Sequence, residues 1–426
     1  MEASKKAASP RVCLLCLSVI KDDPRVRKQG NLLHDAGFAV IGVGLSGGTA
    51  TSPPWVILAP SFVVAATPRA KLAKLLADPG RYSRYLASMA LKPLARCSQR
   101  LAEWLYWSRP ALRNLFEAAS ATAADIYVAN DWNMLPVAQR LAAMHGGSYV
   151  YDSHEYATEE LPESLAWRLF ERGLVVRIEG AHIHGAALVS TVSEGIAEHL
   201  MRDYGLAVEP MVVRNVPQIR IGAGSLSPFR EDGEIVVLFH GGITEHRGLH
   251  IVVDSVRLWR PGRRLVLRGP IGEAYRRRLE AIIDTHALRG RVDIEPPVAA
   301  DRLIEAAAAA DVGIVSLPDT SVENRFALPN KIFEYVSAGL ALLVPQLDEL
   351  AKIVRQHENG RVFVGLSAQA VAGAVNDLDM AMINAFKAKS RLAARVMVWE
   401  REAEPWVKRL AGLAAASGHA ECRRGR

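Results

Sequence analysis

Cysteine is scarce in this chain, with four residues among 426. That scarcity excludes a small scaffold built on disulfide bonds. Two of the four, Cys13 and Cys16, are three positions apart in an expected strand, so their side chains face opposite sides. We therefore expect buried core thiols there, and neither a redox pair nor a pair of metal ligands.

Long apolar runs are also missing. The best candidate, residues 12–20, is much shorter than the roughly 20 residues that span a bilayer, and the charged residues 21–23 follow it directly. No small-residue cleavage site comes next, so the run does not predict a signal peptide. We expect a protein of the cytoplasm.

The sequence has no internal repeat and no low-complexity segment. Half of its residues are hydrophobic and 23% are charged, a balance that excludes a mainly disordered or fibrous chain. At about 150 residues per domain, two or three domains are expected.

Histidine pairs do not add up to a metal site. His182 and His184 are two apart, so on a helix they point to different faces. His246 and His250 are four apart, but no third ligand is evident. We expect no metal cofactor.

Short apolar runs alternate with segments of helical periodicity along the first half of the chain. This alternation predicts a parallel sheet covered by helices. The expected strands are residues 12–18, 39–44, 126–129, 148–151, 187–192 and 210–214, and the expected helices are 26–34, 135–144 and 194–204.

Residues 217–233, with three glycines and two prolines, predict a linker. The alternation then restarts and predicts a second sheet. Strands are expected at 235–240, 264–268, 292–295, 312–317 and 340–345, and helices at 249–259, 273–286, 301–310 and 331–338. A helical tail over 370–413, with a break at Pro405, is expected to close the chain.

We therefore divide the chain into an N-terminal domain (1–216), the linker, a C-terminal domain (234–380), returning helices (381–413) and a flexible tail (414–426). Two parallel sheets place a cleft between two sets of strand ends, where such sheets bind ligands. Functional side chains are thus expected in loops that follow strands.

The segment 327–335 is the most informative. Pro329 predicts a helix start, and the amide groups at such a start attract anions. Lys331 adds a cation in the first turn, which an anionic ligand would compensate. Glu334 can accept two hydrogen bonds from a diol such as ribose. A helix with ordinary surface charges explains the segment about as well.

A glycine pair follows the first strand of the second domain. Gly241 and Gly242 allow the backbone to approach a phosphate closely, and Arg247 can bind phosphate oxygens in a bidentate way. A tight turn between strand and helix is the simpler interpretation of the glycines alone.

Several motifs, in order, resemble those of GT-B glycosyltransferases of family 4, which use nucleotide sugars and retain the anomeric configuration. The resemblance covers about residues 11–410. Its motifs are residues 23–29, 151–155, 192–194, 214–217, 329–334 with Gly339, and 398–400.

The resemblance implies a fold of two Rossmann-like domains that face each other across a cleft, with a C-terminal helix that returns to the first domain. It implies transfer of a hexosyl unit from an NDP-sugar to a glycan or lipid-linked acceptor, without a metal. The implied catalytic residues are His154, Arg247 and Lys331. The implied donor-binding residues are Gly241, Gly242, Arg247, Asn330, Lys331 and Glu334.

Two departures from the family pattern stand out. Phe326 replaces a glutamate that the family often has eight positions before Glu334, and Glu323 or Asn324 are the candidate substitutes. Gly242 stands where the family often has an arginine, and Lys331 is the candidate replacement for that cation.

On the N-terminal side, His154 follows one strand and Asp131 follows another. The resemblance places His154 beside the transferred sugar, whereas the residue alone favours a polar loop histidine. Asp131 can accept a hydrogen bond from an acceptor hydroxyl or cap the next helix, and the two readings weigh equally. Glu155 is the second acceptor-side candidate.

Residues 68–118 carry the whole excess of positive charge. Three acids, Asp78, Glu103 and Glu117, accompany ten basic residues, at positions 69, 71, 74, 81, 84, 92, 96, 100, 109 and 113. Aromatic residues lie between them, a pattern typical of helices on an anionic membrane surface. We expect peripheral contact with the inner face of the membrane and no nucleic-acid partner, and a solvated helical face is the simpler alternative.

Two other functions remain open at this level. A sugar-nucleotide 2-epimerase of the same fold would need no acceptor. A non-catalytic partner subunit would tolerate the missing glutamate and arginine.

Overall fold

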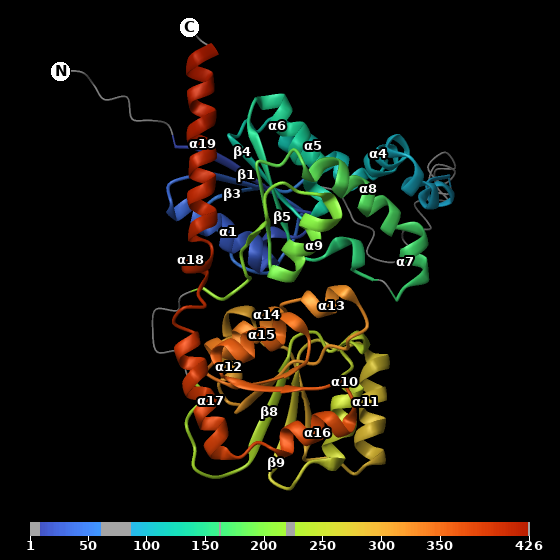
Figure 1. The fold of residues 1–426 in the computed structure, drawn as a ribbon, viewed down its shortest axis with the longest axis vertical. Helices are drawn as coiled ribbons and strands as arrows, with labels where there is room; N and C mark the ends of the chain where they lie inside the picture. The colour runs from blue at the N-terminus through green and yellow to red at the C-terminus, as the bar shows by residue number, and fades with distance from the viewer. Residues whose placement is uncertain (1–8, 61–86, 162, 219–225, 425–426) are drawn as a thin grey trace, which may run out of the picture. The chain divides into compact units, whose positions relative to one another are not determined.

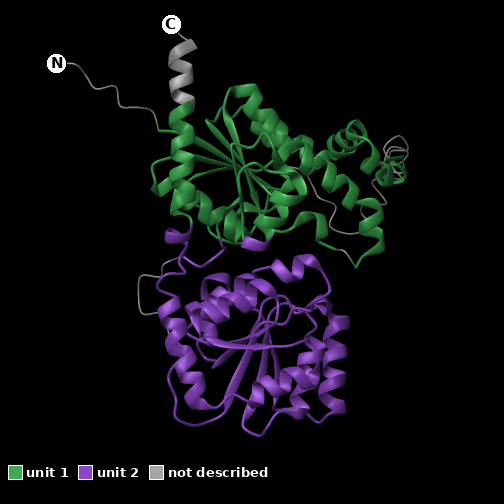
Figure 2. Ribbon diagram, viewed as in Figure 1, with its two compact units in different colours: residues 1–192, 196–213, 403–426 green, residues 193–195, 214–402 purple. Residues whose placement is uncertain are grey.

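The structure is a computed structural model that describes residues 9–60, 87–161, 163–218 and 226–424. The chain divides into two compact units (Figure 2). Unit 1 comprises Met1–Val192, Ile196–Val213 and Ala403–Arg426, and unit 2 comprises Ser193–Gly195 and Arg214–Glu402. Apart from the short segment Ser193–Gly195, the chain changes units at residues 213/214 and 402/403, where the sequence suggested 216/217 and 380/381.

Unit 1 is built on a seven-stranded parallel sheet with the order β3-β2-β1-β4-β5-β6-β7 (Figure 1). The strands are β1 (Arg11–Leu15), β2 (Ala39–Val43), β3 (Val56–Leu58), β4 (Ile126–Asn130), β5 (Ser148–Ser153), β6 (Leu188–Thr191) and β7 (Met211–Val212). The central strands β1 and β4 are apolar and almost fully buried, as a sheet covered on both faces requires.

Helices cover this sheet. They are α1 (Pro24–Asp35), α4 (Gln99–Trp107), α5 (Pro110–Ser120), α6 (Leu135–His145), α7 (Leu165–Phe170), α8 (Arg172–Ile183), α9 (Glu194–Tyr204) and the last helix, α19 (Glu404–Arg424). The first of them begins where Asp23 accepts hydrogen bonds from the amides of Arg25 and Val26, and it ends before Gly37, whose φ is 89°. The return of the chain to unit 1 in α19 is the C-terminal crossing that the sequence predicts.

Unit 2 is built on a six-stranded parallel sheet with the order β10-β9-β8-β11-β12-β13. The strands are β8 (Ile235–His240), β9 (Arg263–Arg268), β10 (Val292–Glu295), β11 (Val312–Ile314), β12 (Ala341–Pro345) and β13 (Gly360–Phe363). The helices are α10 (Leu249–Ser255), α11 (Glu273–Thr285), α12 (Leu303–Ala307), α13 (Val322–Phe326), α14 (Asn330–Ser337), α15 (Asp348–His357), α16 (Ala368–Asn376), α17 (Met380–Ala393) and α18 (Trp399–Glu402). The α/β class and the two Rossmann-like sheets are thereby confirmed.

Both sheets reverse their strand order once, between β1 and β4 in unit 1 and between β8 and β11 in unit 2. Ligands of open α/β sheets bind outside the carboxyl ends of strands at such a reversal. The loops after these four strands are therefore the first places to look for function.

The helical tail differs from the sequence prediction. The chain leaves the helical state at 377–379, at 394–398 and at Ala403, so the expected break near Pro405 is present, two residues before the proline, and two further breaks precede it. Asp379 caps α17 by accepting from the amide of Met382 at 2.7 Å, whereas Pro405 lies in the first turn of α19, where a missing N–H costs nothing. The helix reaches Arg424, well into the segment expected to be a tail.

Part of the expected linker is attached to unit 2. Ser227 is fully buried and its hydroxyl donates to the carbonyl of Ala310. Lys387 donates to the carbonyl of Pro228 at 2.8 Å. Among the linker residues that the structure describes, these two contacts make 227–228 part of the unit.

Candidate functional site

The loop after β8 in unit 2 approaches its neighbour so closely that glycine is required. Gly241 has a φ of 104°, and its carbonyl oxygen would lie only 2.0 Å from a Cβ at Gly269, in the loop after β9. The amide of Gly241 donates to the carbonyl of Arg268 at 3.0 Å. Because no side chain covers the backbone at Gly241, a ligand such as a phosphate could approach that backbone closely.

Helix α14 begins at Asn330, one residue before the start that the sequence predicts. Pro329 is the residue before the helix and Asn330 its first residue, and no side chain of the described residues caps the first amides. The side-chain amide of Asn215 donates to Oδ1 of Asn330 at 2.8 Å. The start of the helix thus presents uncapped N–H groups, which favour an anion.

Lys331 lies in this first turn and reaches the glycine loop. Its side chain is buried, and its Nζ lies 4.9 Å from the centre of the Phe239 ring and 3.9 Å from where a Cβ on Gly241 would stand. Burial, with the charge of Arg247 and against the opposing effect of Glu334, lowers the pKa of Lys331 to about 7. The amine therefore lacks a full counter-charge, and a nearby anion would favour its charged form.

Arg247 ends a 3-10 helix, Glu245–Arg247, between the glycine loop and α10. Its carbonyl accepts a hydrogen bond from the hydroxyl of Ser316, which follows β11. This bond links the loops at the point where the strand order reverses. Arg247 and Lys331 are close enough for their charges to interact, so the structure brings these two predicted residues together.

Glu334 lies one turn further along α14. Its Oε2 is 2.7 Å from Nε2 of His240, the buried last residue of β8. Tyr335 fixes the same strand end, because its hydroxyl accepts from the amide of His240 at 2.9 Å. The carboxylate of Glu334 is thus held beside the other predicted donor-side residues.

In unit 1, His154 follows β5 and lies between two carboxylates. Its Nδ1 is 3.2 Å from Oδ2 of Asp131, and its Nε2 is 3.0 Å from Oδ2 of Asp152. Burial lowers the pKa of His154, but the two carboxylates outweigh burial and raise it to about 10. The imidazole is therefore a cation at neutral pH.

Asp152 is the anchor of this arrangement. Arg25 donates to both of its oxygens, at 2.7 and 2.8 Å, and further hydrogen bonds come from Gln29 at 2.6 Å and Ser190 at 2.6 Å. Burial favours the neutral acid, but Arg25 and His154 hold the pKa of Asp152 far below its usual value. The carboxylate therefore stays charged and fixes one side of His154.

Asp131 takes a backbone conformation that is rare outside glycine, with a φ of 67°. Its Oδ1 accepts from the amide of His154 at 3.0 Å, and its side chain does not cap the helical turn that follows it. The helix-cap interpretation is therefore wrong. Backbone strain held in place by neighbours is typical of functional sites.

Glu155, the other acceptor-side candidate, is exposed beside His154. Its backbone carbonyl accepts from the hydroxyl of Ser153 at 2.8 Å.

Phe326 and Asn324, near the position where the resemblance expects a glutamate, make packing and hydrogen-bond contacts within unit 2. Phe326 packs against Gly195, where a Cβ would lie 2.0 Å from the ring. The side-chain amide of Asn324 donates to the carbonyl of Pro318 at 2.9 Å. Glu323 is half-buried in the short helix α13.

Sequence reasoning assigned no role to Arg25, Gln29, Asp152 or His240. The first three belong to motifs quoted for the family resemblance, at 23–29 and 151–155, so the signal was present without a function attached to it.

Metal-ligand geometry is absent from the described residues: no three His, Cys, Asp or Glu side chains are grouped so as to hold an ion. His182 contacts Glu103 and Gln139 instead. Cys13 and Cys16 are buried, and burial raises the pKa of each to about 12, as expected for core thiols. No helix in the described part of the chain is long and apolar enough to cross a membrane.

Known proteins share this architecture. Residues 234–379 match the family model described as glycosyl transferases group 1. Over the whole chain, the fold is similar to sucrose-phosphate synthase from Thermosynechococcus elongatus, with a TM-score of 0.71, 18% identity, and coverage of 96% of this chain and 100% of that one.

Two further solved structures are similar. One is HepE from Anabaena in complex with UDP and glucose, with a TM-score of 0.67, 14% identity, and coverage of 95% and 100%. The other is WaaG, a glycosyltransferase involved in lipopolysaccharide biosynthesis, with a TM-score of 0.62, 14% identity, and coverage of 93% and 98%. No curated protein sequence matched the chain.

The fold is therefore that of the GT-B glycosyltransferases. Residues 234–379 carry a glycosyl transferase group 1 domain, and this match, with the glycosyltransferases among the similar structures, supports a transferase enzyme. Neither epimerisation nor a non-catalytic role is favoured by these comparisons.

Proposed function

We propose that the protein transfers a hexosyl unit from an NDP-sugar to a glycan or lipid-linked acceptor, with retention of configuration, in the manner of family 4. Unit 2 binds the donor and unit 1 binds the acceptor.

One observation carries this proposal. Lys331 is a buried lysine with a pKa of about 7, set between the glycine loop and the uncapped start of α14, with Arg247 nearby. The positive charges of Arg247 and Lys331 repel each other. Together with the free amide groups, they attract a multiply charged anion. The diphosphate of a nucleotide sugar has that charge, and similar structures such as HepE hold UDP.

The chemical task is to stabilise a leaving group. As the bond between the sugar and the diphosphate breaks, negative charge grows on the diphosphate. Arg247, Lys331 and the amides of α14 are fixed in advance around the place where that charge would form, which lowers the barrier without reorganisation.

Glu334 suits the ribose of the nucleotide. One of its oxygens lies 2.7 Å from Nε2 of His240. The other oxygen can then accept a hydrogen bond from a ribose hydroxyl.

His154 is assigned to the transferred sugar. Because its two flanking carboxylates keep the ring protonated, the ring does not act as a base at neutral pH. Both ring N–H groups already face Asp131 and Asp152, so we propose that the ring acts on an electron-rich oxygen of the sugar through its positive charge. Asp131, held beside it, is proposed to accept a hydrogen bond from the acceptor.

The cations in this scheme are side chains, so we propose that no metal takes part. Activity should therefore survive EDTA. Complete loss on chelation, with rescue by Mg²⁺ or Mn²⁺, would contradict the scheme.

Peripheral attachment to an anionic membrane is the last part of the proposal. Of the ten basic residues in 68–118, those at 69, 71, 74, 81 and 84 lie outside the described residues. Lys92 and Arg109 both pair with Glu171, so they contribute less to a free surface. The other three described basic residues, Arg96, Arg100 and Arg113, are exposed, and the nearby Trp104 is 47% exposed.

The test is release of nucleotide from a panel of UDP- and GDP-sugars, with and without a membrane extract that supplies acceptors. Release that needs the extract supports a transferase. Interconversion of the sugar without acceptor would identify an epimerase, and inertness towards every donor would favour a partner subunit.

A further inference from the structure

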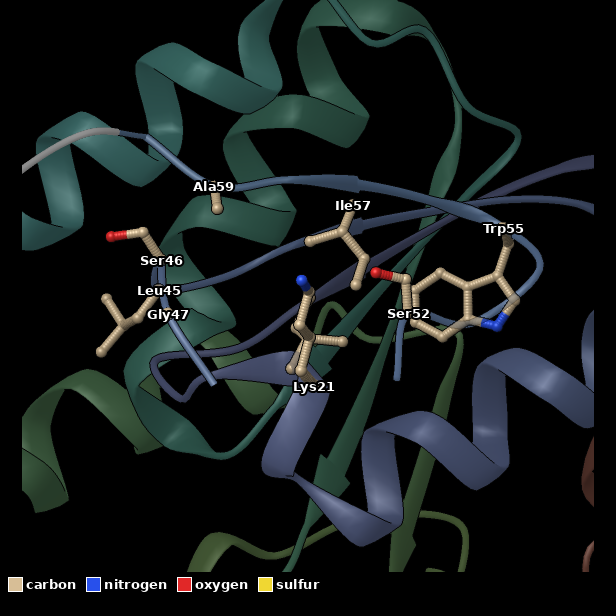
Figure 3. Close-up of a pocket in the computed structure, with 9 residues that line it drawn as sticks. Lys21, Leu45, Ser46, Gly47, Ser52, Trp55, Ile57 and Ala59 are labelled. Carbon is tan, nitrogen blue, oxygen red and sulfur yellow. The ribbon is translucent and has the colours of Figure 1, made fainter. Parts of the chain in front are cut away.

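Unit 1 contains a pocket of about 330 Å³ that the proposed mechanism does not use (Figure 3). It lies beside the edge strand β3, next to the loops that follow β1 and β2. Five apolar residues, one lysine and two serines line it together with a glycine: Ile20, Leu45, Trp55, Ile57, Ala59, Lys21, Ser46, Ser52 and Gly47.

The apolar wall is held rigidly. Trp55 is 6% exposed, and its indole N–H donates to Oδ1 of Asn31 at 2.9 Å. A Cβ on Gly30 of α1 or on Gly42 of β2 would come within 2.3 or 2.7 Å of the ring. The ring therefore fills a slot made by two glycines, and the pocket exists before any ligand arrives.

The polar side of the pocket is a lysine whose neighbouring acids are engaged elsewhere. Asp22 accepts from the amides of Thr49 and Ala50, at 3.1 Å each. Asp23 caps α1 and accepts from the hydroxyl of Ser18. Among the described residues, no carboxylate lies within ion-pairing distance of Nζ of Lys21.

Figure 3 shows the ammonium end of Lys21 turned towards Ser52 and Ile57. An anionic group of a ligand would stabilise this half-buried ammonium, which lies beside apolar walls and serine hydroxyls. The volume is at the small end of ligand sites, which run from about 300 to 1,000 Å³. The space therefore suits one group of a larger molecule.

We propose that this pocket binds the acceptor through an apolar body, aliphatic or aromatic, that carries a single phosphate. The apolar body packs against Trp55 and Ile57, and the phosphate pairs with Lys21. That the ligand is the acceptor rests on the proposed function, whereas binding itself does not.

Calorimetric titration of the full chain without nucleotide tests the binding. The probes are octyl phosphate, phenyl phosphate, 1-octanol and inorganic phosphate. We expect octyl or phenyl phosphate to bind at least about tenfold more tightly than octanol or inorganic phosphate, since either half alone loses one set of contacts. A preference for octyl phosphate would indicate a lipid phosphate, and a preference for phenyl phosphate a soluble aromatic one.

Variants assign that binding to the pocket. Lys21→Gln should weaken phosphate-probe binding by about 10- to 100-fold, the effect of losing one charge-assisted contact. Ile57→Ser should weaken it as well. Lys408→Gln, which removes the same charge from α19 outside the pocket lining, should bind as the wild type does. Equal binding by Lys21→Gln and wild type, or equal affinity for inorganic and octyl phosphate, would overturn the proposal.

The pocket and the proposed transferase function can be tested independently of each other. If the protein turns over a nucleotide sugar but Lys21→Gln binds octyl phosphate normally, the pocket is misassigned and the proposed function stands. If the probes bind through Lys21 but no nucleotide sugar reacts, the pocket stands and the proposed function is wrong. If both stand, Lys21→Gln should raise the KM for acceptor at least about tenfold and leave donor affinity unchanged.

Discussion

Arg25 and Asp152 form a buried, bidentate ion pair although they are 127 positions apart in the sequence, with N···O distances of 2.7 and 2.8 Å. The pair joins the first turn of α1 to the end of β5. Since the same carboxylate holds His154 at 3.0 Å, the geometry of the acceptor-side site depends on a residue that does not touch the site itself.

Arg25→Gln should destabilise the protein strongly, because it leaves the Asp152 carboxylate buried without its main partner. Breaking a buried pair in this way costs about 3–5 kcal/mol. The measurement is urea denaturation, read at the transition of unit 1. The control is Arg202→Gln, which breaks the exposed pair with Asp203. Equal effects of the two changes would contradict the role given to Arg25.

The charge on His154 should make stability depend on pH. Its pKa is raised to about 10 in the folded protein and is about 6.5 in the unfolded chain. The stabilisation is therefore complete below about pH 6.5 and is lost as the pH rises towards 10. The difference in unfolding free energy between wild type and His154→Gln should shrink over that interval. A difference that is constant from pH 6 to pH 10 would show that the ring is not held as a cation.

Nucleotide binding should take up a proton near neutral pH. The pKa of Lys331 is lowered to about 7 in the free protein, so the amine is charged below that pH and largely neutral above it. A bound diphosphate favours the charged form and raises the pKa, so a proton enters on binding at pH 8. Calorimetry in two buffers of different ionisation enthalpy measures the uptake, and Lys331→Gln should lower it. The same uptake in wild type and variant would remove Lys331 from the phosphate site.

Membrane attachment should be electrostatic and weak. Replacement of Arg96, Arg100 and Arg113 by Gln should reduce co-sedimentation with anionic vesicles, since each basic residue near such a surface contributes about 1 kcal/mol. High salt should have the same effect. Replacement of Arg289, Lys389 and Lys408, which changes the charge equally, is the control. Equal binding to neutral and anionic vesicles would leave the solvated-face interpretation.

The sheets could be predicted from the sequence because parallel strands buried on both faces are continuous apolar runs, such as 126–129 and 340–345. The half-buried edge strands β3 and β13 lack that signal and were missed, as was α15, whose ten residues are rich in charge. In the tail, one helix break falls at Ala403, two residues before the proline that marked it, whereas the start of α17 depends on the Asp379 cap, which the sequence prediction did not include.

The sequence could predict which candidate site residues lie together where they share one local segment. Lys331 and Glu334 share one helix, and the glycine loop beside them follows a recognisable strand. The network around Asp152 of β5 could not be predicted, because it joins Arg25 and Gln29 of α1 and Ser190 of β6 to that carboxylate. No spacing along the chain encodes that meeting, which only the packed sheet produces.

The central claim is that unit 2 holds the nucleotide of a sugar donor between the glycine loop and α14. Calorimetric titration with UDP and with GDP tests it most directly, on wild type, Glu334→Ala, Lys331→Ala and the control Glu358→Ala, an exposed acid paired with Lys389. We expect wild type and control to bind one of the two nucleotides alike. Each site variant should lose about 1.5–3 kcal/mol of binding free energy, the value of a charge-assisted hydrogen bond. Failure of the wild type to bind either nucleotide, or unchanged affinity in both site variants, would contradict the account.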